Sequence, residues 1–282
     1  MNYAWIMTIN YAYLGPAGTF TEAALQKIAT SSDHLIAFVN VTAVLDAVRN
    51  GECQKALVPI ENSIEGVVAR TLDELALGQP LVITAETILT VTFSLITLSN
   101  TNPKEIKSIA THPHAESQCR SFIAKNYPNA QVIESSSTAA AAKGLSKGEY
   151  DAAIAGSNAA LNYNLKVIAE NIGDNIGAVT RFVLVEKPGN QPKPTGKDRT
   201  SLAVFIALDH AGALLEILNV FAKHQVNLTF IQSRPTGSQL GHYHFIIDTE
   251  GHIEDKPISA ALAGLKEICE DIRFLGSYPQ AN

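Results

Sequence analysis

The stretch Asn175-Ile-Gly-Ala-Val-Thr180-Arg181-Phe182-Val-Leu-Val-Glu186 begins in a glycine-containing loop and continues as an apolar run. This pattern predicts a loop that leads into a buried strand, with Thr180 and Arg181 at the junction. A hydroxyl beside a guanidinium offers a neutral proton donor and a planar fork for a carboxylate. Alone the pair is weak evidence of function, because Thr-Arg on a strand is usually packing plus a solvated charge.

Short strands and helices alternate along the chain before this stretch. Alternation of this kind predicts mostly parallel sheets that are covered by helices on both faces. Two such sets, joined by long strands and closed by the strand with Thr180, predict two α/β lobes with a cleft between them, a favoured place for ligands. The predicted strands are 11–14, 56–58, 81–84, 87–98, 106–111, 131–134 and 152–155, and the predicted helices are 19–28, 43–49, 66–77, 113–125, 138–145 and 157–161.

Residues 187–199 differ in composition from the chain on either side. They hold three prolines and two glycines without apolar periodicity, which predicts a linker. Beyond them the pattern predicts strand 201–208, helix 212–224, strands 228–233 and 242–249, helix 258–269 and strand 272–275. A βαββαβ unit of this size is the ferredoxin-like arrangement, and the open edge of its sheet favours dimerisation. We therefore divide the chain into 10–187, a linker at 188–199, and 200–280.

Composition and charge exclude several classes of function. The 282 residues carry a net charge of -6, whereas nucleic-acid binding usually shows a basic patch. The N-terminus lacks the order of a signal peptide, and Glu86 and several threonines interrupt the most apolar stretch, so no membrane span is predicted. Cys53, Cys119 and Cys269 are far apart without metal-type spacing, as expected of reduced cysteines in the cytoplasm.

Two loops carry polar groups where ligands often bind. In Gly15-Pro-Ala-Gly-Thr19-Phe-Thr-Glu22, Thr19 and Glu22 have capping-box spacing, so free N–H groups at the helix start suit an anion. A plain structural turn explains this loop equally well, and its glycines fit neither the dinucleotide fingerprint nor a P-loop. Glu61-Asn62-Ser63 follows a strand at a position where α/β sheets bind ligands, and it also suits a helix cap.

Other polar clusters have structural explanations. His112-Pro-His114 and His242-Tyr-His244 lack a converging third ligand, so no metal site is predicted. The serines at 135–137 favour a helix N-cap, and no Gly-x-Ser-x-Gly elbow is present. The sequence therefore shows no nucleophile, metal or nucleotide signature, but it does predict a cleft lined by Thr, Ser, Asn, Gln and one Arg.

Seven short motifs, in order, resemble those of prephenate dehydratases that carry a C-terminal ACT domain. The motifs are Gly15-Pro-Ala-Gly-Thr-Phe20, Pro59-Ile-Glu-Asn-Ser63, Thr111-His-Pro113 with Gln118-Cys119, Ser137-Thr-Ala139, Thr180-Arg-Phe182, Gly212-Ala-Leu214 and Ser233-Arg-Pro235. Each is unspecific alone, but their order and the domain boundary together make the resemblance strong. It implies an α/β fold: a two-lobed, periplasmic-binding-protein-like catalytic domain with a cleft, followed by a ferredoxin-like βαββαβ ACT domain.

The resemblance implies removal of water and carbon dioxide from prephenate to give phenylpyruvate. Aromatisation drives this reaction, so no cofactor and no metal are expected. Thr180 is implied as the catalytic hydroxyl and Arg181 as a carboxylate clamp, unless strand alternation turns its side chain away. The complete set of implied active-site residues is Thr180, Arg181, Phe182, Glu61, Asn62, Ser63, Thr111, Gln118 and Thr19.

The same resemblance implies that the ACT domain binds L-phenylalanine, the end product of the pathway, between two such domains. A homodimer or homotetramer follows, with no nucleic-acid or membrane partner. Two residues depart from the family pattern: Gln232 stands where Glu is usual, and His114 where Gln is usual. The implied effector site consists of Gly212, Ala213, Leu214, Asn227, Gln232, Ser233, Arg234 and Pro235.

The sequence leaves two alternatives open. Arogenate dehydratase acts on the aminated substrate, and the sequence does not separate it from prephenate dehydratase. A non-catalytic amino-acid sensor would also have a two-lobed cleft, because solute-binding folds share that shape. The complete set of catalytic motifs argues against the sensor.

Overall fold

The computed structural model describes residues 8–206, 210–237 and 243–281. Contacts between residues divide the chain into two compact units. The first contains the chain up to Val44, Leu57–Val67 and Ile88–Phe182. The second contains Leu45–Ala56, Val68–Thr87 and the chain from Val183 onward.

The strand predicted around Thr180 is β11 (Val179–Glu186), and it lies inside a six-stranded sheet with the order β2-β1-β3-β11-β5 and β4 paired with β3. It is buried from Thr180 to Glu186, which explains its continuous apolar run. The other strands are β1 (Asn10–Leu14), β2 (His34–Phe38), β3 (Lys55–Asn62), β4 (Gly66–Val67) and β5 (Val82–Thr90).

Two expectations for this sheet and its surroundings were wrong. The helix expected from residue 66 begins at Ala69 as α3 (Ala69–Leu77), because Gly66, with φ of 81°, and Val67 form β4 instead. Two strands were expected at 81–84 and 87–98, but the break between them lies later in the chain. Strand β5 continues through Glu86 to Thr90, and the chain then enters a different sheet. Helices α1 (Phe20–Leu25) and α2 (Val41–Arg49) lie where the patterns predict them.

A second sheet, in the first unit, has the order β10-β6-β9-β7-β8. Strand β7 is parallel to β8 and β9, whereas β6 is antiparallel to β9 and β10, so this sheet is mixed rather than mostly parallel. Both faces are apolar and buried: Ile109 and Ile154 belong to one core cluster, Ala110 and Ala153 to another. The strands are β6 (Ser94–Thr97), β7 (Ser108–Thr111), β8 (Gln131–Glu134), β9 (Ala152–Ala155) and β10 (Lys166–Ala169).

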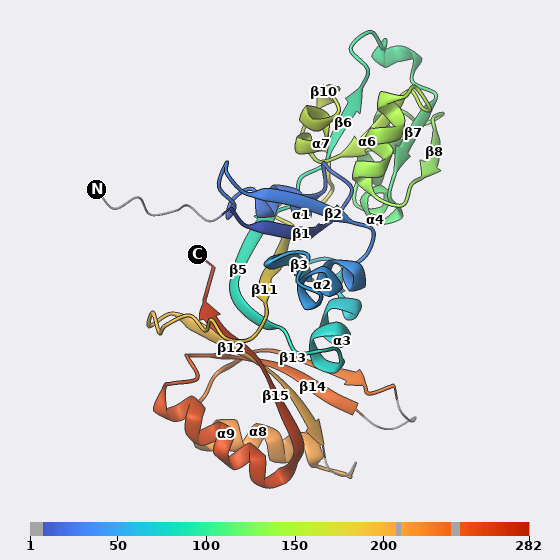
Figure 1. The fold of residues 1–282 in the computed structure, drawn as a ribbon. Coiled ribbons are helices and arrows are strands. Elements are labelled where there is room, and N and C mark those ends of the chain that lie inside the picture. The colour runs from blue at the N-terminus through green and yellow to red at the C-terminus, as the bar shows by residue number, and fades with distance from the viewer. Residues whose placement is uncertain (1–7, 207–209, 238–242, 282) are drawn as a thin grey trace, which may run out of the picture. The chain divides into compact units, whose positions relative to one another are not determined.

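Four helices accompany this sheet, and Figure 1 shows α4, α6 and α7 near its strands. The single helix expected at 113–125 is two helices, because the chain breaks at Gln118 and Cys119 between them. Gln118 is the C-cap of the first helix, and Cys119 is the N-cap of the second. The helices are α4 (Pro113–Ser117), α5 (Arg120–Asn126), α6 (Thr138–Ser146) and α7 (Ser157–Asn162).

The chain after the linker forms an antiparallel sheet with the order β13-β14-β12-β15. Figure 1 shows α8 and α9 on one face of this sheet, where they bury Ile217, Phe221 and Leu265. This is the predicted ferredoxin-like βαββαβ arrangement, and the predicted fold class is confirmed. The elements are β12 (Asp198–Ile206), α8 (Ala213–Lys223), β13 (Leu228–Pro235), β14 (Tyr243–Glu250), α9 (Lys256–Ile268) and β15 (Cys269–Pro279). His242 lies outside the described residues.

Helix α3 and the first half of β5 belong to the same unit as this sheet. Arg273 Nη1 donates to the carbonyl of Gly78, just after α3, at 2.6 Å. Gly276, with φ of 145°, passes so close to the Ile83 backbone that a Cβ would overlap the Ile83 carbonyl oxygen. The face of this sheet away from α8 and α9 is therefore in direct contact with Gly78, just after α3, and with Ile83 in β5.

A buried histidine makes the stability of this region depend on pH. His244 is fully buried and stacks on Phe205, and among the described residues neither ring nitrogen has a hydrogen-bond partner. Burial lowers its pKa below the ordinary 6.5, with Asp73 raising it and Arg234 lowering it. The folded chain therefore keeps His244 neutral, while the unfolded chain takes up a proton as the pH falls through 6.5.

The free energy of unfolding is therefore expected to be highest above pH 6.5 and to decrease as the pH falls below that value. Urea unfolding of the wild type and His244→Phe, from about pH 8 to about pH 5, checks this expectation. The pKa of His112 is also lowered, but His112 is present in both proteins. The difference between their unfolding free energies at each pH therefore reports on His244 alone. Parallel pH profiles for the two proteins would contradict the expectation.

Candidate active site

Thr180 is held at the start of β11 by the residues that end β3. Its hydroxyl oxygen accepts a hydrogen bond from Asn62 Nδ2 at 2.8 Å. Ser63 fixes the neighbouring backbone: its N–H donates to the Val179 carbonyl at 2.9 Å, and its hydroxyl oxygen accepts from the Val179 N–H at 3.0 Å. Because Asn62 supplies the proton of their shared bond, the Thr180 hydroxyl keeps its own proton available for donation.

The Asn62 amide is itself fixed by the turn that follows. Its Oδ1 accepts the backbone N–H groups of Ile64 and Glu65, both at 2.9 Å. This is the local bonding that makes asparagine favourable in turns, and it settles which amide atom faces Thr180. The amide is therefore pre-oriented, with its NH₂ toward the threonine.

Arg181 points to the other face of the strand. Successive strand residues alternate, and the partners agree: Thr180 meets Asn62, whereas Arg181 meets Glu61, with Nη1 and Oε2 3.8 Å apart. Arg181 is only 6% exposed. Thr180 and Arg181 therefore do not direct their polar atoms to one point, and Arg181 is paired within the protein.

A second polar group forms around Gln118, at the break between α4 and α5. Gln118 is buried, and its Nε2 donates to Glu65 Oε1 at 3.0 Å. Glu65 Oε2 lies 3.7 Å from His114 Nδ1. His112 caps α4 by accepting the His114 N–H, and burial together with the nearby His114 lowers the pKa of His112. Sequence reasoning missed Glu65, although its place three residues after Asn62 in a turn was a usable signal.

The remaining predicted residues already have structural partners. Thr111 is buried and its hydroxyl donates to the Ile154 carbonyl at 2.9 Å. Thr19 caps α1, since its hydroxyl accepts the Glu22 N–H and donates to the Leu14 carbonyl. Phe182 is 1% exposed and belongs to the protein core. These side chains hold the loops and strands of the site in place.

The glycine loop before α1 favours the structural explanation over the anion site. The Gly18 N–H donates to Glu22 Oε2 at 2.6 Å, so a carboxylate of the chain already occupies this donor. Glu22 also accepts from the Tyr13 hydroxyl and from Asn162 Nδ2. Burial and the nearby Glu22 raise the pKa of Tyr13, which keeps its proton for this bond.

The predicted effector residues lie at the start of α8 and along β13. Gly212, with φ of 98°, begins α8, Ala213 is buried, and Leu214 is exposed on the helix surface. In β13, Arg234 donates two hydrogen bonds to Asp73, at 2.9 and 2.8 Å. Gln232 donates to the neighbouring Ser233 carbonyl, and Asn227 is exposed. Strand β13 is the outer strand of its sheet as far as the structure describes it.

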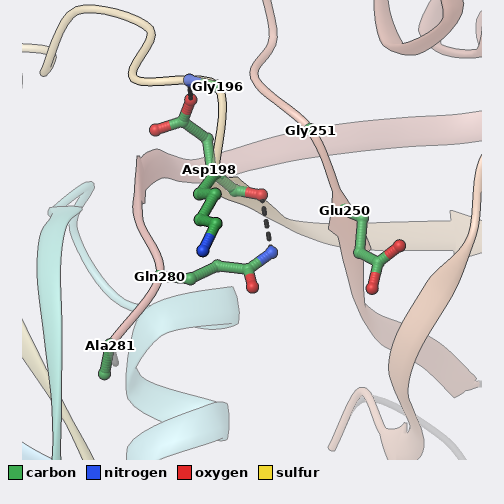
Figure 2. A pocket seen from close by; sticks show the side chains of 7 residues that line it. Gly196, Asp198, Glu250, Gly251, Gln280 and Ala281 are labelled. Carbon is green, nitrogen blue, oxygen red and sulfur yellow. Dashed lines mark hydrogen bonds between the residues drawn. The ribbon is translucent and has the colours of Figure 1, made fainter.

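A pocket of about 420 Å³ lies where the linker meets the third sheet (Figure 2). Part of its polar lining is already used, since the Asp198 carboxylate accepts the Thr195 and Gly196 N–H groups and Gln280 donates to the Asp198 carbonyl. The pocket contains none of the predicted site residues. Its lining is Gly196, Lys197, Asp198, Glu250, Gly251, Gln280 and Ala281.

Two further properties concern ligands and membranes. Within the described ranges, no three His, Cys, Asp or Glu side chains gather in a group that could hold a metal ion. No helix in the part of the chain that the structure describes is long and apolar enough to cross a membrane.

Comparison with known proteins decides the family. Residues 11–190 match the family model for prephenate dehydratase. The chain belongs to the prephenate dehydratase family. Residues 200–267 match the model for the ACT domain, so the catalytic and regulatory parts of the resemblance are both confirmed. Membership makes the chain a lyase that removes water and carbon dioxide from prephenate to give phenylpyruvate.

Individual relatives agree over nearly the whole length. A prephenate dehydratase from Amycolatopsis methanolica is 45% identical over 272 residues, covering 96% of this chain and 88% of the relative. The crystal structure of a prephenate dehydratase from Arthrobacter aurescens in complex with L-Phe has a TM-score of 0.90 and 48% identity, covering 96% of this chain and 90% of that one.

The fold also occurs with another described activity. GqqA, described as a novel type of quorum quenching acylase, has a TM-score of 0.85 and 27% identity, covering 96% of this chain and 98% of that one. Fold likeness therefore does not fix the chemistry by itself. The higher identity to prephenate dehydratases over the full chain favours their reaction.

Proposed function

We propose that the chain forms phenylpyruvate from prephenate at the site around Thr180 and is inhibited by L-phenylalanine bound to its ACT domain. The observation that carries the catalytic part is the 2.8 Å hydrogen bond from Asn62 Nδ2 to the Thr180 hydroxyl. In this proposal residues 10–187 are the catalytic domain, 188–199 the linker and 200–280 the regulatory domain.

The reaction needs a proton donor more than it needs an electron sink. As the ring carboxylate leaves as carbon dioxide, its bonding electron pair enters the ring and expels the hydroxyl group on the opposite carbon. Protonation of that oxygen gives water, and the ring becomes aromatic. Thr180 donates a hydrogen bond to the leaving oxygen, and the Asn62 amide strengthens this donation by polarising the hydroxyl. Threonine is a weak acid, so Thr180 stabilises the departing oxygen by its hydrogen bond and solvent water supplies the proton that completes the water molecule.

The other predicted residues support this geometry. Gln118 faces the site from α4 and offers an amide to the substrate. Ser63 fixes Val179 beside Thr180, and Glu61 pairs with Arg181 on the opposite face of the strand. We assign Thr111, Thr19 and Phe182 to positioning the strands and loops, because their side chains are already bonded to backbone or packed in the core.

The regulatory part of the proposal places L-phenylalanine at the start of α8 and along β13. The relative from Arthrobacter aurescens, crystallised with L-Phe, supports this ligand. Strand β13 has an outer edge in its sheet, and its exposed residues Ile231, Ser233 and Pro235 suit contact with a second copy. We therefore propose a homodimer or homotetramer. The free cysteines Cys53, Cys119 and Cys269 fit a location in the cytoplasm.

An assay of the purified chain tests the whole proposal. Phenylpyruvate is expected from prephenate, and L-phenylalanine is expected to lower the rate. Arogenate, assayed in parallel, separates the two dehydratase substrates, and prephenate is expected to react faster. Absence of product from prephenate would contradict the catalytic proposal and favour the amino-acid sensor. Full activity at saturating L-phenylalanine would contradict the regulatory part alone.

A further inference from the structure

We propose that Glu65 is a positioning residue of the dehydratase site and that His114 compensates its charge. The inference rests on the proposed function and adds a residue that neither the motifs nor the family resemblance assigned. Glu65 follows the Pro59–Ser63 motif and lies in the turn before β4. Its importance comes from its position between two predicted site residues.

A chain of hydrogen bonds passes through Glu65. Gln118 Nε2 donates to Glu65 Oε1 at 3.0 Å, the Glu65 N–H donates to Asn62 Oδ1 at 2.9 Å, and Asn62 Nδ2 donates to Thr180. The two motifs come from different sheets, β3 and β7, and Glu65 joins them. Without its carboxylate the buried Gln118 amide loses a partner and is free to rotate.

The charge of Glu65 needs compensation, because prephenate carries two carboxylates. His114 supplies it, with Nδ1 3.7 Å from Glu65 Oε2. The titratable groups that face this cluster are Glu65 itself, His112, whose ring lies 4.8 Å from that of His114, and Glu134, which acts on His112.

The two roles predict different effects of different substitutions. Glu65→Ala removes both the hydrogen bond and the charge, and kcat is expected to fall about 10-fold. Glu65→Gln keeps an acceptor for Gln118, so kcat is expected to remain within about 3-fold of wild type. His114→Gln removes the imidazole beside Glu65 Oε2, and KM for prephenate is expected to rise while kcat changes little.

Steady-state kinetics of the wild type, Glu65→Ala, Glu65→Gln and His114→Gln test the proposal. Glu116→Gln is the matched control, because it removes a carboxylate from α4 that has no hydrogen bond to Gln118 or His114. The control is expected to match wild type in both kcat and KM. Wild-type kcat in Glu65→Ala, equal losses in the two Glu65 variants, or an unchanged KM in His114→Gln would overturn the proposal. An inactive wild type would instead overturn the proposed function, and this proposal with it.

A second, independent observation concerns regulation. Arg234, inside the predicted effector motif, makes a two-pronged ion pair with Asp73 on α3, and both residues belong to the second unit. Each side chain is about three-quarters buried, with 23% and 27% exposed. By sequence, α3 begins two residues after Val67 of β4, and thus soon after Asn62 and Ser63. The geometry points to this pair as the contact through which the effector motif acts on α3.

Neighbouring carboxylates on α3 provide a matched test, which again rests on the proposed function. Asp73→Asn weakens the pair with Arg234, whereas Glu74→Gln weakens a pair with Arg49 in the same unit. Calorimetry is expected to show L-phenylalanine binding within about 3-fold of wild type in both variants, while the inhibition ratio falls about 5-fold or more in Asp73→Asn alone.

Three results would overturn this second proposal: unchanged inhibition in Asp73→Asn, equal loss of inhibition in Glu74→Gln, or loss of L-phenylalanine binding in Asp73→Asn. The third result would make Asp73 part of the binding site rather than of the coupling. A wild type that fails to bind L-phenylalanine would overturn the proposed regulation, and this proposal with it.

Discussion

Thr180→Val is expected to lower kcat for prephenate by about 10²- to 10⁴-fold, the contribution typical of a positioned proton donor. Valine has nearly the same shape as threonine but no hydroxyl, so the leaving oxygen loses its hydrogen bond while the strand stays packed. KM is expected to change little, because the hydroxyl acts mainly when charge develops on the leaving oxygen. Initial rates of phenylpyruvate formation measure both constants.

The loss must be separated from an effect on folding. Thr180→Val leaves the Asn62 amide without its acceptor, which is expected to destabilise the chain by about 1 to 3 kcal/mol. Urea unfolding measures this cost, and the kinetics are then compared at a temperature where both proteins are folded. A folded Thr180→Val with kcat close to wild type would exclude the catalytic role of Thr180.

Asn62→Asp is expected to reduce kcat/KM by about 10²- to 10³-fold, the range for loss of a preorganised donor. The change keeps Oδ1, and with it the turn bonds from Ile64 and Glu65. It removes the N–H that donates to Thr180, so the hydroxyl donates to the new carboxylate instead of the substrate. The added charge also repels a substrate with two carboxylates.

The pH dependence of Asn62→Asp provides its control. Activity is expected to recover partly as the pH falls toward about 4, because protonation removes the added charge. Asn62→Ala, which removes the donor without adding charge, is expected to show a smaller loss and no such recovery. Near wild-type activity in Asn62→Asp together with a loss in Asn62→Ala would indicate that Asn62 serves the turn alone, because only alanine removes the Oδ1 that accepts the turn bonds.

The sequence was sufficient for most of the order of elements and for the family. The continuous apolar run after Arg181 is the pattern of an interior strand, and β11 is one. The βαββαβ order after the linker follows from periodicity and turn residues. Short strands such as β2 and β10 were missed because their partly exposed residues lack a clear apolar run. The break at Gln118 was missed because the flanking residues favour a helix equally well.

The polar geometry of the site could not be derived in the same way. Motif order assigned both Thr180 and Arg181 to the site. The structure shows that their side chains point to opposite faces of the strand, because Thr180 contacts Asn62 and Arg181 contacts Glu61. Glu65 belongs to the site through a contact with Gln118, which lies 53 residues further along the chain. Contacts of this range depend on tertiary packing, so neither spacing nor propensity predicts them.

The most direct test compares the initial rates of phenylpyruvate formation by Thr180→Ser and Thr180→Val. Serine restores the hydroxyl that accepts from Asn62 and faces the leaving oxygen, whereas valine restores only the shape. With both proteins folded, we predict that the serine variant is faster by about 100-fold or more, as expected if the hydroxyl donates a hydrogen bond to the leaving oxygen. Equal rates would contradict the claim that the Thr180 hydroxyl carries the reaction.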